Sequence, residues 1–108
     1  LQLGITFKEN CPDIRNSHAV DVVRGLREFG CDVDIFDPWA EPEEVEKFYG
    51  LKSVKNADVL RFGVYDAVVL AVAHREFTDM DVTKFCDGNA VVFDIKGSLP
   101  REVVDGRL

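Results

Sequence analysis

The segment 7–17, FKENCPDIRNS, carries most of the residues that could bind a charged ligand. An apolar run at 1–6 precedes it and predicts a strand, and the amphipathic run after Ser17 predicts a helix. Lys8 and Arg15 are cationic, and the free backbone N–H groups at a helix N-terminus already favour an anion. The guanidinium group of Arg15 adds a planar fork that suits a phosphate or a carboxylate. The segment is therefore a candidate anion-binding loop, although it lacks the glycines of the usual phosphate-binding loops.

Other interpretations of this loop are open at the level of sequence. Lys8 and Arg15 could be ordinary solvated charges, because Glu9 and Asp13 nearly cancel them. Asp13 could instead orient Arg15 or cap the following helix. Cys11 lies near the helix N-terminus, a position that can activate a thiol. No histidine lies near Cys11 in sequence, so we expect a packing role for it and no catalysis.

Asp37 and His74 are two further polar residues whose positions suggest chemistry. Asp37 follows a predicted second strand, where an acid binds the ribose in dinucleotide-binding folds. The glycine fingerprint is missing, so we favour a strand-ending turn at Asp37 and Pro38. His74 ends a buried run and could be an acid or base, but we favour a hydrogen bond to a neighbouring carbonyl group. His18 is expected to be solvated, and without a nucleophile or acid–base pair the sequence predicts a binding domain.

Composition indicates one acidic domain with a buried core. The chain has 108 residues, of which 46% are hydrophobic and 31% charged. Its net charge of −7 argues against nucleic-acid binding, which usually needs a basic face. The sequence shows no membrane-spanning run or secretory leader, and three scattered cysteines predict neither a disulfide framework nor a metal site. We expect a cytoplasmic protein without a membrane partner, and a segment of a longer chain because Leu1 lies inside a predicted strand.

The hydrophobic periodicity predicts the elements that must position these residues. Strands are predicted at 2–6, 31–36, 51–54, 66–73 and 90–94, a loop at 55–64, and a terminal turn or tail at 100–108. Helices are predicted at 17–29, with Ser17 as N-cap and Gly30 at the C-terminal end, at 41–50, with Gly50 as the stop, and more weakly at 77–86. Alternating strands and helices indicate parallel βαβ units. We therefore expect a three-layer, Rossmann-like α/β domain with a mainly parallel sheet of about five strands. Ligands of such sheets bind at the carboxyl ends of the strands, where segment 7–17 would meet AHREF (73–77) and DIKGS (94–98).

Together, the segments GITFKENCPDIRNS, VDIFDPWA, YDAVVLAVAHREF and VVFDIKG resemble the C-terminal domain of the UDP-glucose/GDP-mannose dehydrogenase family. The resemblance spans 1–108 and implies a parent enzyme with an N-terminal NAD-binding domain, a central domain carrying the catalytic cysteine, and this domain, which binds the UDP-sugar. The parent would oxidise the sugar C6 alcohol to a carboxylate in two NAD-dependent steps, for polysaccharide precursors. AHREF and FKENCPDIRN are most similar to the bacterial branch acting on UDP-N-acetylhexosamines.

The resemblance also assigns residues. The expected substrate-binding residues are Phe7, Lys8, Glu9, Asn10, Cys11, Pro12, Asp13, Ile14 and Lys96, and Arg15 is expected to reach the NAD. Cys11 and Pro12 stand where the family often has threonine and aspartate. Lys96 stands where many relatives have arginine. The resemblance implies a homo-oligomeric full-length enzyme and no activity for this domain alone. The alternative is a stand-alone α/β binding or regulatory module like a response regulator, although the first strand ends without the paired acids of that class.

Overall fold

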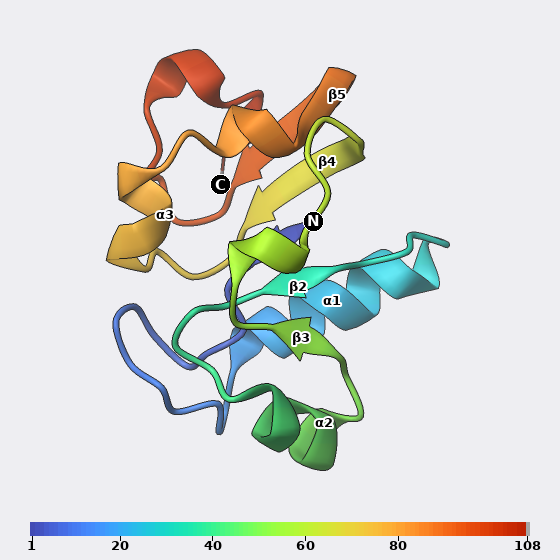
Figure 1. Cartoon of the computed structure of the whole chain (residues 1–108), viewed down its shortest axis with the longest axis vertical. Helices are drawn as coiled ribbons and strands as arrows, with labels where there is room; N and C mark the ends of the chain where they lie inside the picture. Colours follow the sequence, from blue (N-terminus) through green and yellow to red (C-terminus); the bar gives the residue numbers. More distant parts are fainter. Residues whose placement is uncertain (108) are drawn as a thin grey trace.

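The computed structural model describes residues 1–107 and shows a parallel α/β sheet (Figure 1). In this part of the chain the sheet has 6 strands in the order β3-β2-β1-β4-β5-β6, and each pairing between neighbours is parallel. The strands are β1 (Gln2–Leu3), β2 (Ile35–Phe36), β3 (Ser53–Val54), β4 (Tyr65–Leu70), β5 (Cys86–Asp94) and β6 (Gly106–Arg107). The predicted Rossmann-like fold is confirmed, and the parallel pairing of β4 with β5 excludes a hairpin between them.

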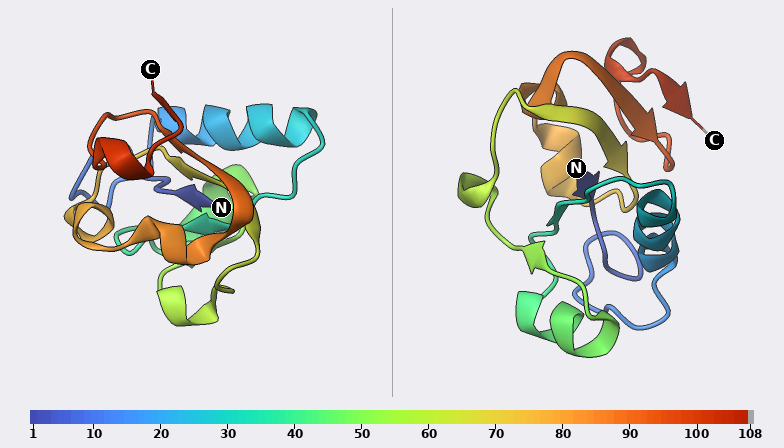
Figure 2. Two further views of the ribbon diagram at one scale, coloured as in Figure 1. Left: turned by 90° about the horizontal axis from the view of Figure 1, so that it is seen from above. Right: turned by 90° about the vertical axis from the view of Figure 1, so that its right-hand side faces the viewer.

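Helices cover both faces of this sheet. They are α1 (His18–Glu28), α2 (Pro42–Tyr49) and α3 (Arg75–Asp79), with short 3-10 turns η1 (Ala57–Val59), η2 (Val82–Phe85) and η3 (Arg101–Val103). Figure 2 shows α1 and α3 on opposite sides of the sheet, which makes three layers. One hydrophobic cluster includes Val23 of α1 and Val45 of α2, and the other includes Phe77 of α3. No helix within residues 1–107 is both long and apolar enough to cross a bilayer.

The helix ends follow their predicted glycines. Gly30 has φ 87° and follows Phe29, the C-cap residue of α1; its N–H donates to the Arg27 carbonyl at 2.9 Å. The N–H of Cys31 donates to the Leu26 carbonyl at 3.1 Å, which completes a Schellman motif. Gly50 ends α2 in the left-handed conformation with φ 66°. Both stops are therefore local properties of the sequence, because a residue without a Cβ adopts these angles at little cost.

Several predicted bounds are wrong. The first strand ends at Leu3 because Gly4 turns away with φ 100°, and the second begins only at Ile35. The weak helix predicted at 77–86 is two pieces, α3 and η2, because the chain is extended at Met80. The loop predicted at 55–64 contains η1, and the segment 100–108 contains both η3 and β6, with residue 108 outside the described part.

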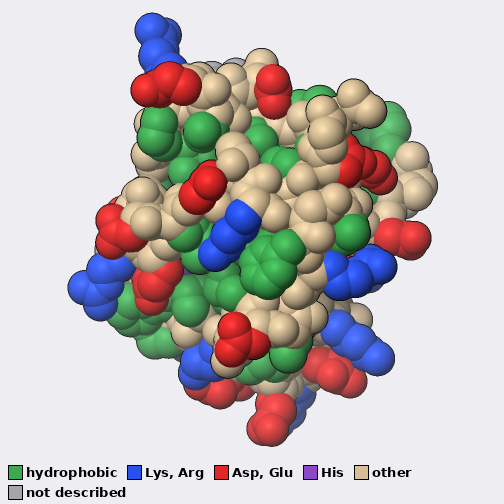
Figure 3. Space-filling view, turned by 45° about the horizontal axis from the view of Figure 1, so that its top comes forward, with side chains coloured by type: hydrophobic (Ala, Val, Ile, Leu, Met, Phe, Trp, Pro, Cys, Tyr) green, Lys and Arg blue, Asp and Glu red, His purple; other side chains and the backbone are tan. Residues whose placement is uncertain are grey.

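The strand ends lie level with one another at the carboxyl edge of the sheet. Leu3 of β1 is in register with Phe36 of β2 and with Leu70 of β4. Leu70 is in register with Asp94 of β5. The segments that follow these residues therefore meet at one edge, as predicted. The space-filling view shows acidic and basic side chains interspersed over the face it presents, with apolar side chains between them (Figure 3).

Candidate functional site

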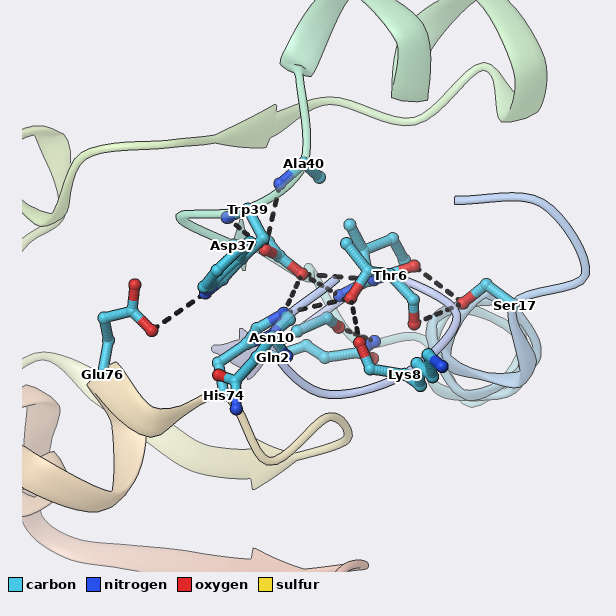
Figure 4. A network of polar contacts seen from close by, with 12 residues as sticks. Gln2, Thr6, Lys8, Asn10, Ser17, Asp37, Trp39, Ala40, His74 and Glu76 are labelled. Carbon is cyan, nitrogen blue, oxygen red and sulfur yellow. Dashed lines mark hydrogen bonds and ion pairs between the residues drawn. The ribbon is translucent and has the colours of Figure 1, made fainter. Parts of the chain in front are cut away.

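Asp37 is the buried centre of the carboxyl edge, with a side chain that is 0% exposed (Figure 4). Its Oδ2 accepts the backbone N–H groups of Ile5 at 2.7 Å and Thr6 at 3.2 Å. Its Oδ1 accepts those of Trp39 at 2.7 Å and Ala40 at 3.1 Å. The turn predicted at Asp37 is confirmed. The same carboxylate also holds the chain that leaves β1, a link that sequence reasoning missed.

His74 completes this buried network. Its Nε2 lies 2.9 Å from Asp37 Oδ2 and 3.0 Å from Thr6 Oγ1, and its Nδ1 accepts the backbone N–H of Asn10 at 2.9 Å. Because Nδ1 is an acceptor, the hydrogen bonds assign a neutral ring that carries its proton on Nε2. The predicted bond from His74 to a neighbouring carbonyl group is therefore wrong. Its partners come from distant segments, which local sequence does not indicate.

These contacts keep Asp37 ionised. Burial by itself would raise the pKa of Asp37, but the hydrogen bonds from His74, and from the backbone of Ile5 and Trp39, outweigh it. The net result is a pKa lowered from its ordinary value of 3.8. At neutral pH the carboxylate is therefore a charged acceptor at the centre of the edge.

Asn10 connects the loop after β1 to the turn after β4. Its backbone N–H donates to His74, and its side-chain Oδ1 accepts the backbone N–H of Arg75 at 2.9 Å. We call these two contacts the Asn10 bridge. Asn10 itself has φ 54°, a left-handed conformation that asparagine tolerates better than most residues. The neighbouring Thr6 hydroxyl donates to the Lys8 carbonyl at 3.0 Å, so the loop is held at Lys8 and again at Asn10.

Trp39 and α3 cover His74 from the solvent side. The Trp39 ring stacks on the His74 ring with a centroid distance of 6.0 Å, and Phe77 approaches the same ring at 5.5 Å. The Trp39 Nε1–H donates to Glu76 at 2.9 Å, and the Arg75 guanidinium lies 5.4 Å from the Trp39 ring centroid. His74 is 0% exposed as a result, so it acts inside the edge and not on its surface.

Ser17 stands at the predicted N-cap position of α1 but does not cap the helix with its side chain. Its hydroxyl donates backwards, to the Ile5 carbonyl at 2.7 Å with the Thr6 carbonyl at 3.2 Å. Gln2, buried in β1, adds a bond from Nε2 to the Ala19 carbonyl at 2.9 Å. The bond from Gln2 therefore fastens the start of α1 to β1. The Ser17 hydroxyl bonds to the chain after β1 and does not cap the free N–H groups of the helix.

The predicted substrate-binding residues share one loop but differ in exposure. Phe7, Lys8, Glu9, Asn10 and Pro12 are exposed, Cys11 and Asp13 are half-buried, and Ile14 is buried. The Ile14 side chain belongs to the core cluster beneath α1, so it supports the loop from below. The other side chains of this set are exposed or half-buried. A hollow of about 530 Å³, lined by Leu1 and Tyr65 among others, lies at the opposite, amino edge of the sheet.

Arg15 is oriented by Asp13, which confirms one of the alternatives left open by the sequence. Its Nε lies 3.0 Å from Asp13 Oδ1 and its Nη2 lies 3.1 Å from Oδ2, so the pair is bidentate. These hydrogen bonds lower the pKa of Asp13 and raise the pKa of Arg15. The Arg15 side chain is still 72% exposed, and a guanidinium has further N–H donors for a ligand. Its contact with NAD remains a prediction.

Lys96 lies in the turn after β5, separated from the loop after β1 by the turn after β4. The Asp94 carboxylate builds this turn by accepting the backbone N–H groups of Lys96 at 2.9 Å and Gly97 at 2.8 Å. The Lys96 side chain is exposed. It therefore lies at the expected edge, and its contact with a substrate phosphate remains a prediction.

Together the fold and the site define a class of protein, a Rossmann-like α/β domain whose charged loop after β1 lies at the carboxyl edge of the sheet. The family model described as "UDP-glucose/GDP-mannose dehydrogenase family, UDP binding domain" matches residues 1–101. The chain belongs to the UDP-glucose/GDP-mannose dehydrogenase family, as its resemblance to that family implied.

Curated relatives and a solved structure agree with this assignment. The chain is 46% identical over 111 residues to the UDP-N-acetyl-D-glucosamine 6-dehydrogenase of Salmonella typhi, covering 100% of this chain and 25% of that protein. It is 42% identical to the protein of the same name from Pseudomonas aeruginosa, covering 100% of this chain and 26% of that one. A UDP-glucose dehydrogenase structure from Pyrobaculum islandicum superposes with a TM-score of 0.75 at 27% identity, over 98% of this chain and 23% of that one. The chain thus spans about a quarter of the length of these relatives.

Proposed function

We propose that this chain is the C-terminal, UDP-sugar-binding domain of an NAD-dependent UDP-sugar 6-dehydrogenase. The parent enzyme would oxidise the sugar C6 alcohol to a carboxylate and so make uronic acid precursors of polysaccharides. The supporting observation is the exposed loop at the carboxyl edge, held by buried Asp37 and His74, in a chain that matches the family's UDP binding domain. The names of the bacterial relatives favour a UDP-N-acetylhexosamine as the substrate. The cytoplasmic setting and the homo-oligomeric state remain predictions.

The loop suits a diphosphate because it carries two cationic side chains, Lys8 and Arg15, within an acidic chain. The whole chain has a net charge of −7, so an anion is attracted only where donors are gathered. Lys8 is exposed on a stretch of backbone that is anchored on both sides, and it would donate charge-assisted hydrogen bonds to the UDP phosphates. Binding at this loop would hold the nucleotide end of the substrate and leave the sugar for other parts of the parent enzyme.

We expect NAD to contact this domain at a single exposed residue and not to be enclosed by it. The loop between β1 and α1 has no glycine from 5 to 17, so its backbone cannot approach a pyrophosphate as a dinucleotide-binding loop does. Arg15, exposed and already oriented by Asp13, is the residue that would reach the cofactor. When bound, NAD supplies the hydride acceptor. The part played by this chain is to bind and orient.

The direct test is dehydrogenase activity of the native polypeptide that carries this chain. NADH formation would be followed with a panel of UDP-sugars, including UDP-N-acetylglucosamine, UDP-N-acetylmannosamine, UDP-N-acetylgalactosamine and UDP-glucose. We expect turnover with at least one of them. A folded native protein that oxidises none of the panel in the presence of NAD would contradict the proposal.

Lys8→Ala is expected to raise the KM for the UDP-sugar about ten- to a hundredfold, because a charged hydrogen bond to an anion contributes roughly 1.5–3 kcal/mol. The melting temperature should change little, since Lys8 is exposed and the hydrogen bond that holds it is made by its backbone carbonyl. Lys52→Ala is the matched control, because Lys52 is also exposed but lies at the amino edge, just before β3. A fall in melting temperature with an unchanged KM would give Lys8 a structural role.

Arg15→Ala is expected to raise the KM for NAD by a similar factor, and Arg15→Lys should recover only part of the loss. An ammonium group cannot reproduce the bidentate fork that the guanidinium presents. If Arg15 only braces Asp13, Arg15→Ala would lower the melting temperature and leave both Michaelis constants alone. Measuring both constants and the melting temperature for the two variants decides between these roles.

Cys11→Ser is expected to leave turnover largely intact. A thiol nucleophile needs a base, and the nearest histidine in the loop network has both ring nitrogens occupied: His74 Nδ1 by Asn10, and Nε2 by Asp37 and Thr6. The measurement is kcat of the native polypeptide with the best UDP-sugar of the panel. A loss of about a thousandfold in a folded variant would show that Cys11 is a nucleophile.

A further inference from the structure

We propose that His74 is a positioning residue for substrate binding: its neutral ring holds the loop after β1 in the conformation that receives the UDP-sugar. This inference rests on the proposed function and assigns a role to a residue that does not itself reach the surface. His74 is 0% exposed, so its influence on a ligand must pass through the groups it touches.

Asp37 determines which nitrogen of His74 faces the loop. The ring Nε2 lies 2.9 Å from the buried Asp37 carboxylate, which requires a proton on that nitrogen. Nδ1 is then left as an acceptor, and it receives the Asn10 backbone N–H at 2.9 Å. A side chain with donors on both nitrogens would oppose that N–H. The neutral tautomer is therefore a requirement of the observed loop conformation.

The Asn10 bridge is the point at which this ring acts on the loop. Asn10 is exposed, yet its backbone donates to His74 and its side chain accepts the Arg75 N–H at 2.9 Å. The Phe7 N–H donates to the Asp13 carbonyl at 2.7 Å, which closes the base of the loop. The bridge thus supports the tip of a loop whose side chains are largely solvent-exposed.

Lys8 connects this geometry to the ligand. Thr6 holds the Lys8 carbonyl at 3.0 Å on one side, and the Asn10 bridge holds the chain on the other. An exposed loop without such anchors would have to be ordered during binding, at a cost in affinity. Preorganisation by His74 should therefore appear in KM and not in kcat, because the role proposed for it is to shape the loop that binds the UDP-sugar.

Two substitutions at position 74 separate the role of Nδ1 from the role of Nε2. In His74→Asn, the side-chain oxygen can stand near the place of Nδ1 and accept the Asn10 N–H, while the contact with Asp37 is lost. In His74→Gln, the amide nitrogen can stand near the place of Nε2 and donate to Asp37, while the acceptor for Asn10 is lost. Both variants give up the ring contacts with Trp39 and Phe77. Asparagine is the shorter side chain and leaves the larger void, so a stronger effect on the loop in His74→Gln would come from the lost bridge and not from lost packing.

Both variants would be made in the native polypeptide, with the best UDP-sugar of the panel as the probe. We expect His74→Gln to raise its KM about five- to tenfold with kcat unchanged, the effect of one lost hydrogen bond, and His74→Asn to stay closer to wild type. Hydrogen exchange without ligand should be faster over residues 7–13 in His74→Gln than in His74→Asn. Equal KM values and equal exchange in the two folded variants would overturn the proposal.

Hydrogen exchange of single amides in the wild-type protein keeps the proposal testable if His74→Gln does not fold. Asn10 is exposed, but its N–H donates to His74 Nδ1, so it should exchange more slowly than the N–H of the neighbouring exposed Glu9. Equally fast exchange of the two amides would overturn the proposal. If the wild-type protein oxidises no UDP-sugar, the proposed function fails, while the exchange comparison still decides whether His74 orders the loop.

Discussion

Asp37→Ala is expected to lower the free energy of unfolding by about 3–5 kcal/mol, the cost of removing one partner from a buried charged network. The Asp37 side chain is 0% exposed and, among the described residues, accepts four backbone N–H groups as well as the His74 ring. Alanine would leave these donors buried without an acceptor. The loop after β1 and the turn after β2 would both lose the group that joins them.

Denaturant unfolding of the variant and of the wild-type protein measures this effect. Asp32→Ala is the matched control, since Asp32 is exposed and should change the free energy of unfolding by about 0.5 kcal/mol or less. A value for Asp37→Ala as small as that of the control would mean that water or a rearranged turn replaces the carboxylate at little cost.

The same carboxylate predicts an acid dependence of stability. The pKa of Asp37 is lowered in the folded protein from its ordinary 3.8, so folding favours the ionised form. This contribution is fully present above pH 3.8 and is lost as the pH falls through the lower pKa of the folded state. In Asp37→Asn the free energy of unfolding should depend less on pH over that acidic range. An unchanged pH dependence in Asp37→Asn would assign the acid sensitivity to other carboxylates.

Gly4→Ala is the second substitution with a large expected effect, a loss of about 2–4 kcal/mol from backbone strain and overpacking together. Gly4 has φ 100°, which residues with a Cβ rarely adopt. A Cβ at this position would lie 2.5 Å from Val72 Cβ and 2.8 Å from the Val72 backbone nitrogen. Relief would require β1 and the turn after β4 to separate, and the Ile5 N–H would then move away from Asp37.

Two further variants test this explanation. Gly25→Ala in α1 has open space for a Cβ and should raise the free energy of unfolding by about 0.5–1 kcal/mol. Val72→Ala combined with Gly4→Ala should restore little, because the contact with the Val72 backbone remains. Full recovery in the double variant would show that the clash is confined to the Val72 side chain.

The sequence by itself determined most of the elements and the edge of the sheet at which the candidate binding loop lies. Continuous apolar runs predicted β4 and β5, amphipathic periodicity predicted α1 and α2, and Gly30 and Gly50 predicted the ends of those helices. These features depend on neighbours a few residues apart, so they are readable along the chain. The parallel connectivity then placed the loop at 7–17 on the carboxyl edge without any coordinates.

Only the tertiary structure decided how that edge is held together. The bond from His74 to Asp37 joins residues 37 positions apart, and the bond from Asn10 to His74 joins residues 64 apart. Serine is a favourable N-cap residue, but the Ser17 hydroxyl donates to the Ile5 carbonyl and does not cap α1. Residue type states what a side chain can donate or accept. Which partner it meets depends on how the strands bring distant segments side by side, because each buried polar group must find its hydrogen bond within the packed fold.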